Sequence, residues 1–315
     1  MIRYIRHDDI NFEKWDSCID RAVNGIFYAY SWYLDMCAVE WDALVEDDYV
    51  SVMPLPWRKK AGIRYCFQPF FIQQLGLFST RSISEESCIR FLEAIPADIM
   101  FGEFTLNTFN GLPEGYPSVS GRGVTYELDL ITPYDRIRGN YSANIRRNIN
   151  KAVKKGVFTV STGRPEDIIQ AFRQNRGRRN IPFGDNDYRV LKHIIYAGIH
   201  RGMVSLRCAY SGTNDFCAGI VFFKSHGKSV LLFSGATPLA RENGAMSMLI
   251  DDYIRENSGS ETVLDFEGSS DPNLARFYRG FGSIECVFLH IRINRMPFWA
   301  KPFLSSYLKI RKHLS

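Results

Sequence analysis

Short apolar segments separated by turn residues fill the first half of the chain and recur, in the same order, in the second half. In the first half we predict strands at 43–46, 49–57 and 63–67, an amphipathic helix at 85–95, and strands at 99–106 and 124–130. In the second half we predict strands at 204–210, 216–224 and 229–233, a helix at 245–256, and strands at 262–267 and 287–293. The pattern therefore indicates an α/β (α+β) protein built from two similar units.

Equivalent positions in the two halves are separated by a nearly constant number of residues. The offset is 167 between Tyr49 and Phe216 and 162 between Phe104 and Phe266. We therefore expect a tandem duplication in which each domain is a mixed, mostly antiparallel sheet flanked by helices. The predicted divisions are a first domain at 1–132, a second domain at 133–295 that begins with a basic helix at 140–156, and a basic, aromatic tail at 296–315.

The two halves differ between their last two strands. The second half has Asp271 as a predicted N-cap and Pro272 in the first helical turn, so a short helix is expected there. The corresponding segment of the first half, 107–123, is rich in glycine and proline and has no helical period. We expect the chemistry in the second half and no donor site in the first.

The net charge of +5 is unevenly distributed. Glu285 is the last acidic residue, and six basic residues follow it. A second basic run contains only Asp135 as a nearby acid and consists of Arg136, Arg138, Arg146, Arg147, Lys151, Lys154 and Lys155. Any affinity for polyanions is expected in these two places. The tail at 296–315 either packs onto the protein or contacts an anionic membrane surface weakly, through its aromatic and basic side chains.

The sequence contains no apolar run long enough to cross a membrane, and its N-terminus lacks the apolar stretch of a signal peptide. We expect a cytoplasmic protein that can bind peripherally to the inner face of the membrane. The seven cysteines form no C-x-x-C pair and are expected to be reduced thiols. No zinc-ligand spacing occurs, so no metal is expected.

An anion site is predicted where the strand at 229–233 leads into the helix at 245–256. Backbone N–H groups at a helix N-terminus bind phosphate well because several unpaired donors point the same way. Arg241, Asn243, Gly244 and Ala245 place a guanidinium, a cap and small residues at this helix start. The alternative is an ordinary strand-to-helix loop in which Asn243 only caps the helix.

Two residues are candidates for proton transfer. Glu267 ends the strand at 262–267, and Asp265 lies two residues earlier, on the same face if the strand alternates regularly. Tyr278 lies on the apolar side of the predicted helix after Pro272. We expect Glu267 as a general base and Tyr278 as a general acid. The alternatives are a loop carboxylate and a core tyrosine.

The order of these elements resembles the GNAT superfamily, and the chain as a whole resembles its double-domain Fem-like and CelD-like branch. The motifs that carry the resemblance are Met53-Pro54-Leu55-Pro56, Gln68-Pro69, Gln73-Gln74-Leu75-Gly76, the basic segment at 141–152, Leu264-Asp265-Phe266-Glu267-Gly268-Ser269 and Ala275-Arg276-Phe277-Tyr278. Arg241, Gly244 and Ala245 match part of the family's phosphate loop, whereas Met246 departs from it. Ala275 precedes Tyr278 by three residues, where the family has four.

The resemblance implies an N-acyltransferase. CelD-like relatives are presumed to use acyl-CoA, for example acetyl-CoA, whereas Fem-type relatives use aminoacyl-tRNA and cell-wall precursors. We expect acyl-CoA as co-substrate and a small-molecule or lipid-linked amine as acceptor, with tRNA as the alternative donor. A binding protein that kept the fold without the chemistry is a further alternative. The residues assigned to the donor are Phe233, Ser234, Gly235, Arg241, Asn243, Gly244, Ala245 and Asn273.

Overall fold

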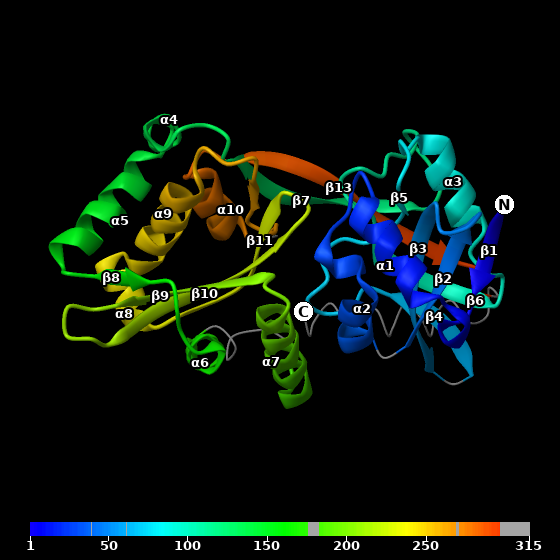
Figure 1. The fold of residues 1–315 in the computed structure, drawn as a ribbon, viewed down its shortest axis with the longest axis horizontal. Coiled ribbons are helices and arrows are strands. Elements are labelled where there is room, and N and C mark those ends of the chain that lie inside the picture. The colour runs from blue at the N-terminus through cyan, green and yellow to red at the C-terminus, as the bar shows by residue number, and fades with distance from the viewer. Residues whose placement is uncertain (39, 61, 176–182, 269–270, 297–315) are drawn as a thin grey trace. The chain divides into compact units, whose positions relative to one another are not determined.

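The computed structural model of the chain describes residues 1–38, 40–60, 62–175, 183–268 and 271–296. Its internal contacts separate two units. The first contains Met1–Gly123 and the described residues from Val287 onward, and the second contains Val124–Cys286. Each unit has a mixed sheet flanked by helices, which confirms the predicted fold class (Figure 1).

In the first unit, an antiparallel series of strands leads to a parallel pair. The strand order is β1-β2-β3-β4-β6-β13, with β5 paired to β3 and with β4 parallel to β6. The elements are β1 (Ile2–Ile5), η1 (His7–Asp9), α1 (Phe12–Arg21), η2 (Phe27–Ala29), α2 (Ser31–Cys37), β2 (Glu40–Glu46), β3 (Ser51–Lys60), β4 (Ile63–Phe67), β5 (Phe78–Ser79), α3 (Glu85–Glu93) and β6 (Ile99–Thr105).

The second unit repeats this arrangement, with the order β8-β9-β10-β11-β12-β7 and with β11 parallel to β12. Its helices are α4 (Tyr134–Gly139), α5 (Ala143–Lys154), α6 (Pro165–Asn175), α7 (Asp185–His200), α8 (Pro238–Asn243), α9 (Ala245–Asn257) and α10 (Pro272–Arg279). Its strands are β8 (Phe158–Val160), β9 (Val204–Tyr210), β10 (Phe216–Ser225), β11 (Lys228–Ala236) and β12 (Val263–Asp265).

The last strand of each unit comes from the other half of the chain. β7 (Val119–Asp129) follows β6 in sequence, but its second part pairs with β12 of the second unit. β13 (Ile284–Asn294) follows β12 in sequence, but its second part pairs with β6 of the first unit. Both pairings are antiparallel. The duplicated units therefore exchange their final strands.

This exchange places the division between the units at other residues than we expected. The prediction ended the first domain at residue 132 and the second at residue 295. In the structure, β7 passes from one unit to the other after Gly123, and β13 returns to the first unit at Val287. The hydrophobic pattern could not reveal this, because a strand has the same alternation of side chains whichever sheet it completes.

The sheet of the second unit is covered on both faces (Figure 1). On one face, Tyr253 of α9 stacks on Phe222 of β10, with ring centroids 3.7 Å apart. On the other face, Ile168 of α6 lies against Gly219 and Gly235 of the central strands. At Gly235 a Cβ atom would overlap the carbonyl oxygen of Ile168, so only glycine permits this approach.

No helix among the described residues is long and apolar enough to span a bilayer. The predicted tail, apart from Met296, lies outside the described residues, and so does its predicted contact with a membrane. The seven cysteines, all among the described residues, form no disulfide with one another.

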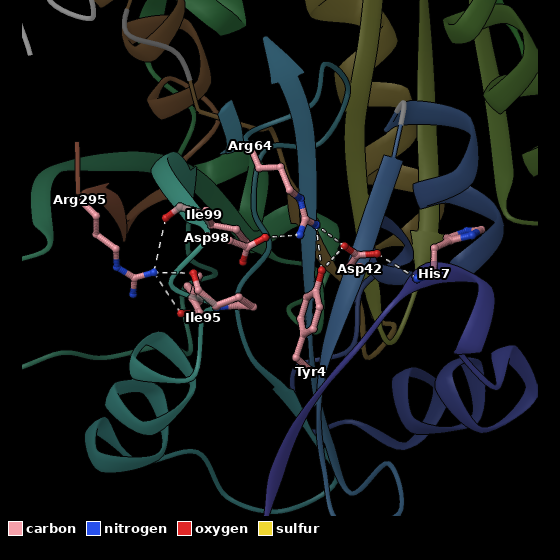
Figure 2. Close-up of polar contacts among 9 residues, drawn as sticks. Tyr4, His7, Asp42, Arg64, Ile95, Asp98, Ile99 and Arg295 are labelled. Atoms are coloured by element: carbon pink, nitrogen blue, oxygen red, sulfur yellow. Dashed lines mark hydrogen bonds and ion pairs between the residues drawn. The ribbon is translucent and has the colours of Figure 1, made fainter. Parts of the chain in front are cut away.

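A buried polar network connects several strands of the first unit (Figure 2). The carboxylate of Asp42, which is only 4% exposed, accepts hydrogen bonds from the Tyr4 hydroxyl at 2.5 Å, the His7 backbone N–H at 2.9 Å and the Arg64 guanidinium at 2.6 Å. Arg64 also donates to Asp98 at 2.8 Å and lies over the Trp57 ring at 4.1 Å. Burial raises the pKa of Tyr4 to about 12. The network ties β1, β2 and β4 together.

Nearby, the guanidinium of Arg295, which follows β13, donates to the backbone carbonyls of Ile95 and Pro96 at 3.1 and 2.6 Å (Figure 2). These carbonyls follow α3. The end of the exchanged strand is therefore attached to the first unit by side-chain hydrogen bonds in addition to its ladder with β6.

Asp42→Asn is expected to lower the free energy of unfolding by about 3 kcal/mol, because it leaves Arg64 partly buried without its closest counter-charge. Urea denaturation followed by circular dichroism measures the change. Lys14→Met is the control, because it breaks the exposed pair between Lys14 and Asp48 and should cost less than about 1 kcal/mol. Equal losses in the two variants would contradict a structural role for the network.

Candidate active site

The strands β11 and β12 are neighbours for only three residues. Lys228–Val230 pair with Val263–Asp265, after which β12 ends and β11 continues to Ala236. In the part of the chain that the structure describes, no strand pairs with this edge of β11 beyond Val230. An unpaired strand edge presents backbone N–H and C=O groups that can bind another molecule.

A β-bulge lies next to this point of divergence. In the ladder between β10 and β11, Val221 pairs with Phe233 and Phe222 pairs with Leu231, so Leu232 is an extra residue in β11. A bulge bends its strand and increases the local twist, and bulges occur frequently beside active sites. The bulge therefore accounts for the departure of β11 from the direction of β12.

The backbone turns sharply immediately after β12. Glu267 has φ +48°, a left-handed conformation that costs a non-glycine residue roughly 1–2 kcal/mol. The Asp265 carboxylate holds this conformation by accepting the Glu267 backbone N–H at 2.9 Å. A Cβ atom at Gly268 would overlap the carbonyl oxygen of Val124 in β7, so glycine is required there. The turn is thus fixed from both sides.

Asp265 belongs to a buried ionic cluster that includes residues of three strands. Its carboxylate is 1% exposed and accepts a hydrogen bond from the hydroxyl of Thr125 in β7. The ammonium of Lys228 in β11 lies 2.6 Å from Glu127 of β7 and 3.5 Å from Asp265. Lys228 therefore serves two carboxylates, one from the exchanged strand and one from β12.

Burial and charge act in opposite directions on this cluster. Burial raises the pKa of Asp265, although the Lys228 charge and the hydrogen bond from Thr125 oppose the rise. Burial alone would lower the pKa of Lys228, but the charges of Asp265 and Glu127 outweigh it and raise the pKa, so the lysine stays protonated. Beside them, burial raises the pKa of the Cys286 thiol to about 11, so this cysteine is no thiolate nucleophile at neutral pH.

The two predicted proton-transfer residues, Glu267 and Tyr278, have different environments in the structure. Glu267 is half-buried at the point where β11 and β12 diverge, but its positive φ interrupts the regular alternation that we assumed for it and Asp265. Tyr278 is 6% exposed and its ring stacks on Phe266, with centroids 4.9 Å apart. The ring of Tyr278 is therefore packed in the core of the second unit, and its role as general acid stays a prediction.

The three strand residues assigned to the donor lie beyond the bulge of β11. Phe233 contacts Phe172 of α6, with ring centroids 4.7 Å apart, and Gly235 lies against the backbone of the same helix. The side chain of Ser234 points to the opposite face of the strand and is half-buried. Only the backbone of this segment remains available at the unpaired edge.

The predicted phosphate loop forms α8 and the first turn of α9, and much of it is buried. Asn243 is 2% exposed; its side chain donates to the Cys217 sulfur at 3.1 Å and accepts the Ala245 N–H at 3.0 Å. A Cβ atom at Gly244 would overlap the Asn148 carbonyl of α5. Asn243, Gly244 and Ala245 therefore contribute to packing, whereas Arg241 is exposed on α8.

The start of α9 also has few free donors. The N–H groups of Ser247 and Met248 both bond to the Gly244 carbonyl, at 3.1 and 3.3 Å, in addition to the bond of Ala245 to Asn243. At α10 the Asn273 N–H bonds to its N-cap, Asp271, at 2.9 Å, as predicted for that cap. The start of α9 therefore lacks the open row of N–H groups that we expected there, and the backbone N–H of Asn273 is occupied by its cap.

Sequence analysis missed Thr125, Glu127 and Lys228. Glu127 and Thr125 lie in a strand whose alternating polar positions are typical of any half-exposed strand, and Lys228 begins β11 directly after the turn at Gly227. Their meeting depends on the pairing of β7 with β12, between residues more than 100 positions apart. Among the described residues, no group of three or more histidine, cysteine or acidic side chains is arranged to hold a metal ion.

The sequence matches no protein-family model and no curated protein. Solved structures do share the fold. FemX has a TM-score of 0.63 and 13% identity over 92% of this chain and 97% of its own. A domain from Agrobacterium fabrum, named as the C-terminal part of a lysylphosphatidylglycerol synthetase, has a TM-score of 0.56 and 10% identity over 93% and 94% of the two chains. L-PGS from Bacillus licheniformis has a TM-score of 0.52 and 12% identity over 96% of each chain.

These similarities extend over 92–96% of this chain. At such low identity they establish the fold alone. The chain therefore has a two-domain GNAT-like fold of the Fem-like type, as the sequence motifs suggested.

Lys228→Met is expected to destabilise the protein by about 3–5 kcal/mol at neutral pH, because it leaves Glu127 and Asp265 buried together without a counter-charge. Loss of the lysine removes the charge that opposes the effect of burial, so the pKa of Asp265 in the folded state rises further. The folded variant then binds more protons than the unfolded chain at mildly acidic pH, so its stability rises as the pH falls. Urea unfolding at pH 5 and pH 8 should show a smaller difference from wild type at pH 5.

The double variant Lys228→Met with Asp265→Asn is the matched control, since it removes one of the two unpaired charges. It should recover part of the lost stability and lose part of the pH dependence. If Lys228→Met lowers the free energy of unfolding equally at both pH values, the loss comes from a packing defect and not from the ionic cluster.

Proposed function

We propose that this protein is an N-acyltransferase that transfers an acyl group from acyl-CoA to the amine of a small or envelope-related acceptor. The observation that carries the proposal is the separation of β11 from β12, with Glu267 held in a strained conformation at the point of divergence. Strained residues persist where the surrounding structure fixes them, and they are concentrated at functional sites. The proposal assigns the reaction to the second unit.

Acyl transfer to an amine requires a base for the amine and donors for the oxygen of the reacting carbonyl. Glu267 is the base in this proposal, because it is half-buried and follows the last paired residue of β12 by two positions. The unpaired N–H groups of β11 beyond Val230 are the donors for the thioester carbonyl. Asp265 positions Glu267 through the backbone hydrogen bond and does not itself meet the substrate.

The proton for the leaving thiolate is assigned to Tyr278, on the resemblance to the GNAT motif. Its ring lies against Phe266, the residue that separates Asp265 from Glu267, so the tyrosine is close to the turn in the fold. The shared fold supports a transferase, since one structural neighbour is named as a synthetase of lysylphosphatidylglycerol. That name also motivates the inclusion of lipid-linked amines among the acceptors to be screened.

The second candidate is a Fem-like transferase that takes its acyl group from aminoacyl-tRNA. The closed start of α9 favours it, because Asn243, Gly244 and Ala245 are buried and leave little room for a pyrophosphate. In this alternative, the aminoacyl ester binds at the unpaired edge of β11, where β11 and β12 diverge. Glu267 and Tyr278 keep their roles in proton transfer.

A thermal-shift screen separates the two donors. Acetyl-CoA and longer acyl-CoA species should raise the melting temperature by several degrees at 100 times the Kd, which corresponds to about 2.7 kcal/mol of added stability. Arg241→Ala should weaken the shift, because an exposed guanidinium on α8 remains available to the phosphates. If no thioester shifts wild type, the acyl-CoA proposal fails, and the aminoacyl-tRNA donor and the non-catalytic alternative remain.

Glu267→Gln is expected to reduce turnover by about 10²–10⁴-fold while leaving the melting temperature nearly unchanged, because the amide cannot accept the amine proton. The release of free thiol from acetyl-CoA, measured with a panel of amines, reports turnover. The control is Glu261→Gln, which changes an exposed carboxylate of the same unit outside the site. Equal turnover in the two variants would remove Glu267 from the reaction.

A further inference from the structure

The outward side of α5 is strongly cationic and takes no part in the proposed reaction. Ile145, Ile149 and Ala152 are buried and attach the helix to the second unit. The side opposite to them, defined here as the cationic face, consists of Arg146, Arg147, Lys151, Lys154 and Lys155. With 3.6 residues per turn, these five residues cover about half of the helix circumference.

These basic residues lack carboxylate partners in the part of the chain that the structure describes. Arg147 donates to the side chain of Asn144 at 2.7 Å, which leaves its charge uncompensated. Some basic side chains of the same unit are paired, as Lys192 is with Glu166 at 2.8 Å and Arg173 with Asp185 at 2.6 Å. On α5, by contrast, none of the five basic side chains has such a pair among the described residues.

The neighbouring helices continue this charge. Arg136 and Arg138 are exposed on α4, which precedes α5, and Arg241 is exposed on α8, which packs against α5. Asp135 and Glu242 are the exposed acids of these two short helices. Self-repulsion among so many like charges disfavours the folded state, and an anionic partner would relieve it.

The composition of the face favours a lipid surface over a nucleic acid. Val153 is 62% exposed and lies within 20° of Arg146 around the helix, at the border between the cationic face and the buried side. An exposed aliphatic side chain gains free energy when it enters the apolar boundary of a bilayer. Single-stranded nucleic acids are bound through exposed aromatic side chains, and no aromatic residue of α4 or α5 is among the exposed large hydrophobic residues described.

We propose that the cationic face of α5 docks this protein on an anionic membrane surface, with Val153 entering the headgroup boundary. The attraction is electrostatic and weak for each residue, roughly fivefold in partitioning per basic side chain close to the surface. The inference does not depend on acyl transfer, because binding is measured without donor or acceptor. It concerns the described helix and not the tail at 296–315.

Co-sedimentation of the full chain with vesicles tests the proposal. Wild type should sediment with phosphatidylglycerol vesicles at low salt, be released as the salt concentration rises, and stay in solution with phosphatidylcholine vesicles. The quadruple variant Arg146→Gln, Arg147→Gln, Lys154→Gln, Lys155→Gln should lose at least about tenfold in partitioning. Both chains keep the tail, so any contribution from the tail cancels in the comparison.

The matched control neutralises four exposed basic residues elsewhere, Lys59, Arg81, Arg122 and Arg189, and changes the net charge equally. This control should bind like wild type. Equal binding of the α5 variant and wild type, or equal loss in both variants, would overturn the proposal. A short RNA duplex that binds wild type more tightly than the anionic vesicles at the same salt, and whose binding the α5 variant loses, would overturn it in favour of a nucleic-acid surface.

Discussion

The exchange of final strands between the two units is the constraint on which the rest of the structure depends. A parallel pair such as β11 and β12 needs a further neighbour to bury its polar backbone edge, and β7 supplies that neighbour by pairing with β12. In the same way, β13 completes the sheet of the first unit beside β6. Neither sheet is complete with residues from its own half alone.

The candidate site follows directly from this exchange. β7 brings Thr125 and Glu127 beside β12, where they meet Asp265 and Lys228. Asp265 then has enough donors to stay buried and can fix the backbone of Glu267 in the left-handed region. The strain at Glu267 is therefore maintained by contacts that only the exchanged strand provides. A duplication without the exchange would lack both the counter-charge and the Val124 carbonyl that confines Gly268.

The start of α9 and the outward side of α5 differ in how accessible they are to an anion. The start of α9 resembles a phosphate site in sequence, yet α5 covers it and Asn243 satisfies its first donor. The cost of burying Asn243 is offset because its side chain also bonds to Cys217. The outward side of the covering helix, in contrast, collects exposed cations. Packing has thus closed one potential anion site and left an exposed cationic surface on the other side of the same helix.

The sequence determined the elements and their order. The periodicity located β4 (Ile63–Phe67) and β9 (Val204–Tyr210) at their observed bounds and placed the start of α9 at Ala245, because these segments have strong local patterns and clear turn residues. The same local patterns, with the motifs quoted above, led to the two-domain GNAT-like fold. The cap at Asp271 was predicted because a capping side chain bonds within its own turn.

The tertiary structure decided which strands pair across the chain, and with them the site. Whether β7 completes the first sheet or the second cannot be read from alternation, because both sheets offer the same kind of edge. The ion pair of Glu127 with Lys228, the burial of Asn243 and the contact of the Tyr278 ring with Tyr126 all depend on residues far apart in sequence. Local chemistry specified the strands and helices. The energies of burial and of long-range pairing specified what each polar side chain meets, and these energies have no signature in a single segment of sequence.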